Sequence, residues 1–152
     1  MTLQTQLETA KKLAFKYHAG QVDKAGKNYI YHPLKVSEMC KNEKAKIAGL
    51  LHDIIEDTPV TSKDLIEAGI DPEIVQAIVL VTKKKENFSE QEYFENIKKN
   101  EIAREVKMCD LTHNMDRSRI PEPVPEYMKK KWKRYAKEYK FLNESSLTWN
   151  EL

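Results

Sequence analysis

The chain has 152 residues, the length of one domain, and 40% of them are hydrophobic, which is enough for a packed core. Its 26 Lys and Arg against 24 Asp and Glu give a net charge of +2, which excludes strong charge-driven binding to nucleic acid or anionic membranes. The two cysteines form no CxxC motif and no apolar leader follows Met1, so we expect free thiols in a cytoplasmic protein.

Helical periodicity dominates the chain from its start. Apolar residues recur at alternating steps of three and four near the N-terminus, which predicts a first helix that Gly20 ends. The polar segment 21–31, QVDKAGKNYIY, contains two turn-forming elements and indicates a loop. Pro33 suits the first helical position, so a second helix is predicted from there to about Asn42.

The third predicted helix carries segment 48–60, AGLLHDIIEDTPV, and stops near Thr58 because Pro59 disfavours a helical residue before it. Short polar residues ahead of an acid or a proline then predict further helix starts: Thr61 with Asp64, Asp71 with Pro72, and Ser89 with Glu92. Gly69 should end the helix that Thr61 caps. Another helix should cover about Glu101 to Met115.

The last predicted helix spans about residues 125–143, after the stiff connector IPEPVP. Its apolar side chains share one stripe: Met128, Trp132, Tyr135, Tyr139 and Leu142. Such a stripe favours packing in the core or in a homodimer, and base stacking between its lysines is the alternative. No segment alternates apolar and polar residues over five positions, so the fold class should be all-α, a single helical domain over 1–152.

Segment 48–60 divides its residues between two helical faces. On a helical wheel the aliphatic residues fill one face, while His52, Asp53, Glu56 and Asp57 gather on the other. Three carboxylates within two turns and no nearby Lys or Arg repel one another unless a cation or a substrate gathers them. Imidazole and carboxylate together suit a divalent transition metal, and a plain acidic surface helix is the alternative.

Other polar residues could complete such a site. His32 directly precedes Pro33 at the head of a predicted helix, where it is either a ligand or a packed ring. Four residues share a face of the helix predicted at 101–115: Lys107, Asp110, His113 and Asn114. Lys24, Lys27 and Lys107 could offset phosphate charge, or could be ordinary surface lysines.

Four motifs carry a family resemblance. "YIYHP", "LLHDIIEDT", "VTK" and "VKMCDLTHNM" occur in the order and spacing of the HD-domain phosphohydrolases. The chain resembles most of all the hydrolase domain of RelA/SpoT-type alarmone enzymes and their small stand-alone relatives. The resemblance covers about residues 4–120, and the combination of motifs is far more specific than one His-Asp pair.

The resemblance implies that one metal, commonly manganese in this family, is held by four side chains: His32, His52, Asp53 and Asp110. Glu56 and Asp57 match the acidic pair that positions and activates the attacking water in that family. Asn114 matches a residue near the substrate sugar, and His113 matches a residue that is not a ligand. "VTK" at 81–83 is a structural match more than a catalytic one.

Two positions depart from the family pattern. Where the alarmone hydrolases carry an Arg that stacks on guanine, this chain has Asp23 followed by Lys24, which lacks a planar stacking surface. Leu111 stands where those enzymes usually have Arg. The metal ligands that the resemblance implies are all present.

The resemblance implies a manganese-dependent hydrolase that removes pyrophosphate from the 3′ position of guanosine tetra- or pentaphosphate, together written (p)ppGpp; the tetraphosphate is guanosine 3′,5′-bis(diphosphate). Two alternatives remain: a metal phosphohydrolase acting on another nucleotide or phosphate ester, and a nucleotide-sensing module without turnover. We expect a small-molecule nucleotide as the partner, with no nucleic acid and no membrane, and we leave a homodimer open.

Overall fold

Helices account for all the regular secondary structure, which confirms the all-α prediction. The structure, a computed structural model, describes residues 1–152. Its α-helices are α1 Leu3–Tyr17, α2 Tyr31–Met39, α3 Glu43–Leu51, α4 Ile54–Asp57, α5 Ser62–Glu67, α6 Pro72–Leu80, α7 Glu90–Lys98, α8 Glu101–Asn114 and α9 Glu126–Asn143. Short 3-10 helices cover Arg117–Arg119 and Trp149–Glu151, and no helix is both long and apolar enough to cross a membrane.

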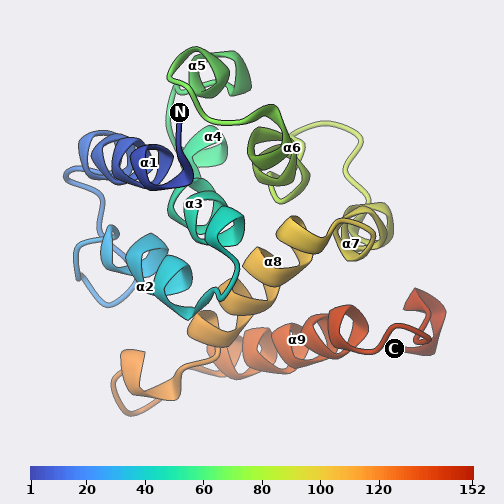
Figure 1. Cartoon of the computed structure of the whole chain (residues 1–152). Helices are drawn as coiled ribbons and strands as arrows, with labels where there is room; N and C mark the ends of the chain where they lie inside the picture. Colours follow the sequence, from blue (N-terminus) through green and yellow to red (C-terminus); the bar gives the residue numbers. More distant parts are fainter.

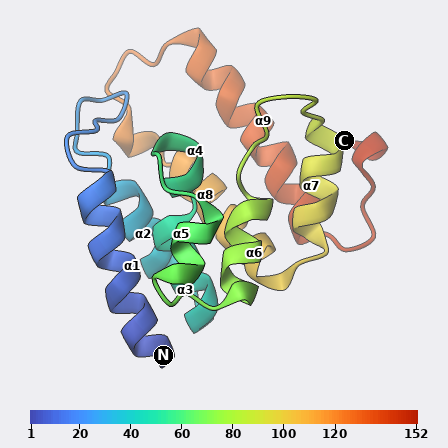
Figure 2. The same ribbon diagram turned by 90° about the horizontal axis from the view of Figure 1, so that it is seen from above.

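Helix α3 lies at the centre of the fold and contacts α1, α2, α6 and α8 (Figure 1). Seen from above, α1 and α7 lie on opposite sides of the molecule (Figure 2). The backbones of α2 and α3 come close at Gly49, where an added Cβ would lie 3.2 Å from backbone atoms of Ser37. This close packing brings the first turn of α2 beside the end of α3, where the predicted metal ligands lie.

The continuous third helix predicted from the sequence is wrong, because the helix breaks between α3 and α4. His52 ends α3, and Asp53 precedes α4 with φ −107° and ψ 0°. The His52 Nδ1 lies 2.7 Å from the carbonyl oxygen of Gly49, which the Asp53 N–H would bind in a continuous helix. The break frees the Asp53 side chain from the helical spacing of about 100° per residue.

The second helix also differs from its prediction. It begins at Tyr31 and ends at Met39, so Pro33 is its third residue and Asn42 lies beyond it. The Asn42 side chain accepts hydrogen bonds from the N–H groups of Lys44 and Ala45, so this residue caps α3 instead of ending α2.

All three predicted helix starts are confirmed, with Thr61, Asp71 and Ser89 as the N-cap residues, and two of these residues make a side-chain cap bond. Thr61 and Asp64 make a reciprocal capping box, and the Ser89 side chain accepts from the Glu92 N–H. Asp71 precedes α6 without a side-chain cap bond. On α9 the predicted apolar stripe packs inward: Met128, Trp132 and Leu142 are buried, and Tyr135 and Tyr139 are half-buried.

Candidate metal centre

Three predicted ligands converge beside the break between α3 and α4. His32 comes from the first turn of α2, and His52 and Asp53 come from the break itself. One ligand atom from each lies within 4.8 Å of the others, and His52 Nε2 is 3.0 Å from Asp53 Oδ2. Both histidines are buried, so the group forms a candidate divalent metal site inside the protein.

Asp110, the fourth predicted ligand, borders this group from the last turns of α8. Its Oδ1 lies 2.8 Å from His32 Nε2 and 3.4 Å from His52 Nε2. The ammonium of Lys107 donates to Asp110 Oδ2 at 3.1 Å, and the Asn114 amide donates to Oδ1 at 3.1 Å. Lys107 therefore neutralises and orients this buried carboxylate, whereas the sequence suggested a role in offsetting phosphate charge.

The imidazole of His52 is oriented as a metal ligand requires. Its Nδ1 donates to the Gly49 carbonyl oxygen, which leaves Nε2 with its lone pair in the neutral ring. Nε2 is buried without a hydrogen-bond partner, although oxygens of Asp53 and Asp110 face it. Lone pairs that face one another need a proton or a cation between them, so these residues fit a divalent ion.

His32 shows the same arrangement through a residue that the motifs left without a role. The rings of His32 and His113 are stacked, and their Nδ1 atoms lie 2.7 Å apart. Burial, and then the charges of Arg119 and His32, lower the pKa of His113 to about 4. Neutral His113 can therefore accept a hydrogen bond from His32 Nδ1, and this leaves His32 Nε2 to face Asp110.

Charges in the cluster are strongly coupled. Burial opposes ionisation of His52, but the carboxylates of Asp53 and Asp110 outweigh it and raise the pKa of the ring well above its usual value. Burial likewise opposes the Asp53 carboxylate, yet His52 lowers the pKa of Asp53 to about 2. Lys107 and the two imidazoles overcome burial and hold the pKa of Asp110 well below its usual range. The carboxylates are thus ionised at neutral pH, as metal binding requires, and a divalent ion at Nε2 would replace the proton that they otherwise hold on His52.

Tyr29 is a further contact of the cluster that the sequence did not single out. Its hydroxyl donates to Asp53 Oδ2, and burial followed by the Asp53 charge raises the pKa of the phenol. The only sequence signal was its place as the first residue of the YIYHP motif.

The acidic pair on α4 lies at the surface, one turn beyond the cluster. Glu56 is exposed, and its Oε1 accepts a hydrogen bond from the backbone N–H of Lys83 at 2.8 Å. This bond ties α4 to the end of the VTK segment, which gives that segment a role in holding Glu56. Partial burial, and then the charges of Asp53 and Glu56, raise the pKa of Asp57 to about 6.

In protein freed of metal by a chelator, Asp57→Asn is expected to raise stability at pH 7 and to have little effect near pH 4. The Asp57 pKa is about 6 when folded against an ordinary 3.8, so the folded state binds this proton more tightly. The carboxylate therefore lowers the free energy of unfolding as the pH rises through 6. Urea midpoints of both proteins at the two pH values test this, and an equal difference at both would contradict it.

A cavity of about 290 Å³ adjoins the metal cluster. Tyr29 and His32 line it on the cluster side, and Lys24 and Asn114 line it too. Five further lining residues are apolar or aromatic, namely Val22, Ala25, Ile120, Met128 and Tyr135, and three are charged, namely Asp23, Asp116 and Arg119. Lys27, the other predicted substrate contact, is exposed and does not line this cavity.

Asp23, the departure from the family pattern, holds the loop at the mouth of this cavity. Its Oδ1 accepts from the backbone N–H groups of Ala25 and Lys27, each at 2.9 Å. Its Oδ2 lies 3.7 Å from Nη2 of Arg119, whose Nη1 donates to the His113 carbonyl oxygen at 3.0 Å. A guanidinium is therefore present at the cavity, supplied by Arg119 from beyond α8. The other departure, Leu111, is buried in the core.

Asp23→Ala is expected to loosen this loop. The amides of Ala25 and Lys27 lose a charged acceptor, so their hydrogen exchange should become at least about tenfold faster. Asp116→Ala is the matched control, because Asp116 caps the neighbouring turn at Ser118 and makes no hydrogen bond to the loop. Unchanged exchange at both amides in Asp23→Ala, measured by NMR, would show that Asp23 does not hold the loop.

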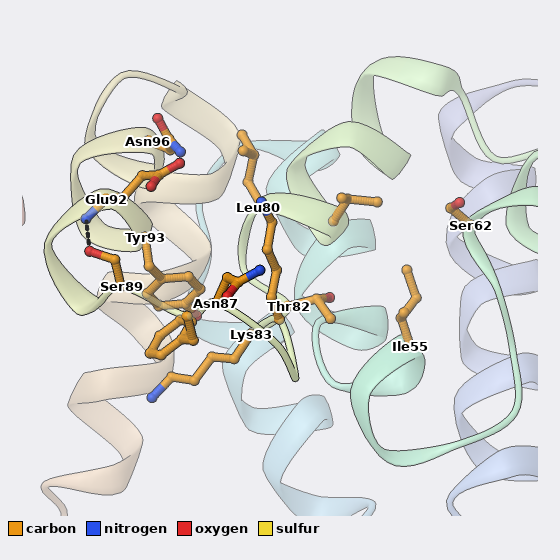
Figure 3. A pocket seen from close by; sticks show the side chains of 13 residues that line it. Ile55, Ser62, Leu80, Thr82, Lys83, Asn87, Ser89, Glu92, Tyr93 and Asn96 are labelled. Atoms are coloured by element: carbon orange, nitrogen blue, oxygen red, sulfur yellow. Dashed lines mark hydrogen bonds between the residues drawn. The ribbon is translucent and has the colours of Figure 1, made fainter.

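A second cavity, of about 340 Å³, lies between α4, α6 and α7 (Figure 3). Ile55, Leu80 and Tyr93 contribute apolar wall, and Lys83 and Asn87 contribute polar groups. The Tyr93 hydroxyl donates to the Val81 carbonyl oxygen at 2.7 Å, which fixes the VTK segment from this side. None of the four cluster residues lines this cavity, and neither does Glu56 or Asp57, so the cavity lies apart from the candidate metal site.

Comparison with known proteins identifies relatives of this chain. The family model for the HD domain matches residues 10–117. A GTP pyrophosphokinase of Myxococcus xanthus is 37% identical over 66% of this chain and 15% of its own length. A guanosine-3′,5′-bis(diphosphate) 3′-pyrophosphohydrolase of Haemophilus influenzae is 35% identical over 64% of this chain and 16% of its own length. The chain thus spans about a sixth of these curated relatives.

A solved structure shares the fold. The structure of a metazoan ortholog of SpoT that hydrolyses ppGpp superposes with a TM-score of 0.74 and covers 92% of this chain and 86% of the other. The two sequences are 22% identical, so this likeness shows the fold.

Proposed function

This chain belongs to the HD domain family, and we propose that it is a metal-dependent phosphohydrolase, specifically a manganese-dependent (p)ppGpp 3′-pyrophosphohydrolase. One observation carries the proposal of metal-dependent hydrolysis: the orphaned Nε2 of His52, which faces two carboxylates beside His32. The choice of substrate rests on relatives such as the Haemophilus influenzae pyrophosphohydrolase.

Four residues would hold the ion: His32, His52, Asp53 and Asp110. A divalent ion bound there supplies Lewis-acid chemistry, which acidifies water and polarises a phosphoryl oxygen. Two neutral imidazoles and two carboxylates accept manganese, and iron, cobalt and nickel as well. His113, Gly49 and Lys107 keep the ligands in the required orientation and charge state.

Glu56 is proposed as the proton acceptor for the attacking water, with Asp57 beside it. The hydrogen bond from the Lys83 N–H fixes one oxygen of Glu56 and leaves the other free to accept a proton. Asp57 shares the same turn, and its raised pKa favours proton uptake near neutral pH.

The nucleoside part of the substrate is proposed to occupy the cavity of about 290 Å³ beside the cluster. Asn114 donates to Asp110 and lines this cavity, and it is proposed to contact the sugar. Lys24 and Lys27 on the neighbouring loop are proposed to offset phosphate charge. Apolar wall beside a few polar groups is typical of a nucleotide site.

The proposed function also implies a domain organisation, a cellular location and a class of partner. We propose a single HD domain over residues 1–152, acting in the cytoplasm on a small nucleotide, with no nucleic-acid or membrane partner and with homodimer formation left to experiment.

The test is a substrate panel. Purified, manganese-loaded protein should release pyrophosphate from guanosine 3′,5′-bis(diphosphate), and a chelator should abolish the release. Activity on other phosphate esters but not on this nucleotide would reject the proposed substrate and favour the broader phosphohydrolase. Binding of the nucleotide without any turnover would favour the sensing module instead.

A further inference from the structure

Two lysines from distant parts of the chain meet at one aromatic ring. Lys24 lies on the loop before α2, and Lys131 lies in the second turn of α9. Their Nζ atoms lie 5.4 Å and 5.9 Å from the ring centroid of Tyr127, which is exposed on the same helix. The ring thus holds two cations close together at the junction of the loop and α9.

No acidic side chain neutralises this pair. Neither lysine takes part in any ion pair of the chain, and the carboxylate of neighbouring Asp23 is occupied by loop amides and Arg119. The neighbouring Lys24, then partial burial and Arg134, lower the pKa of Lys131 to about 8. Two ammonium groups held together destabilise each other, and a bound anion would relieve that repulsion.

The pair adjoins the proposed nucleotide site. Lys24 lines the same cavity as His32, so one continuous space connects Lys24 with the metal cluster. Lys131 does not line the cavity and joins Lys24 at the ring of Tyr127. A substrate that occupies this cavity with its cleaved phosphate group at the cluster could therefore reach the lysines with another anionic group.

We propose that Lys24 and Lys131 form an anion subsite that binds the phosphate group of the substrate that is not hydrolysed. The proposal rests on the proposed function and deepens it, because it assigns α9 a direct part in substrate binding. It also selects for nucleotides with phosphate at two positions. Lys131 would act through binding alone, since it has no contact with the metal cluster.

Guanosine 5′-diphosphate is the probe, because it carries the uncleaved diphosphate and no 3′ phosphate group that could be hydrolysed. Isothermal titration calorimetry on metal-loaded protein should show binding that is about tenfold weaker in Lys131→Ala. The control Lys130→Ala removes an exposed lysine of the same helix that makes no ion pair, and should bind like wild type. Lys24→Ala should weaken binding as Lys131→Ala does.

Equal affinity of wild type and Lys131→Ala would overturn the subsite. Equal weakening in Lys130→Ala would also overturn it, because that result indicates general charge attraction. The subsite would also be overturned if wild type bound guanosine 5′-diphosphate no more tightly than guanosine, even if the protein hydrolysed the alarmone. Lysine-dependent binding without alarmone hydrolysis would reject the proposed reaction and leave the subsite standing.

Discussion

Asp53→Asn is expected to lose the bound divalent ion and at least about 10³-fold in kcat/KM together, equivalent to about 4 kcal/mol of transition-state stabilisation. The amide keeps the shape of the side chain and can still accept from Tyr29. It carries no negative charge, however, so it neither attracts the ion nor balances the imidazole of His52. Metal content by mass spectrometry and turnover should therefore fall in parallel.

Asp71→Asn is the matched control for this substitution. Asp71 precedes α6, makes no side-chain cap bond and lies outside the cluster, so the variant should keep both metal and activity. Asp53→Asn protein that is metal-free and fully active would refute a metal-dependent reaction at this site.

Glu56→Gln is expected to keep the ion and to lose about 10²- to 10⁴-fold in kcat, the usual range for removal of a general base. The glutamine amide oxygen can still accept from the Lys83 N–H, so the side chain should stay in place. It cannot take a proton from water. Single-turnover kinetics with measured metal occupancy separate this effect from loss of the ion.

Glu86→Gln provides the comparison, because Glu86 is an exposed carboxylate of the neighbouring loop that makes no ion pair. It should match wild type in rate. If Glu56→Gln retained the full rate while Asp57→Asn lost it, Asp57 would be the proton acceptor and the assignment of Glu56 would be wrong.

Helix positions and the all-α class followed from local features of the sequence. Alternating three- and four-residue steps marked α1 and α9, and the capping box of Thr61 and Asp64 marked the start of α5. Such signals involve neighbours in the chain, so periodicity and cap chemistry suffice to predict them. The sequence placed Asn42 at the end of α2, whereas it caps the start of α3. A polar residue between two helices can serve either one, and the local sequence does not distinguish the two roles.

The sequence named the residues that come together in the candidate site but did not predict how they are arranged in space. The motifs named His32, His52, Asp53 and Asp110, but a continuous helix would have kept His52 and Asp53 about 100° apart. The break that unites them depends on a ring-to-carbonyl bond within α3.

The supporting residues lay beyond sequence reasoning because they meet the site across long separations. His113 contacts His32 across 81 positions, and Arg119 reaches Asp23 from the segment after α8. Asp23 illustrates the limit most clearly. In the sequence, Asp23 stands where the family pattern has an arginine. In the fold, its carboxylate holds the loop and pairs with Arg119, which follows α8.

The most direct test of the account is the location of the metal. Anomalous diffraction from crystals of manganese-loaded protein should show one peak bordered by His32, His52, Asp53 and Asp110. That result would establish the cluster as the metal centre from which the proposed chemistry follows. A manganese-free cluster in crystals of active protein, or a peak elsewhere in the fold, would contradict the account.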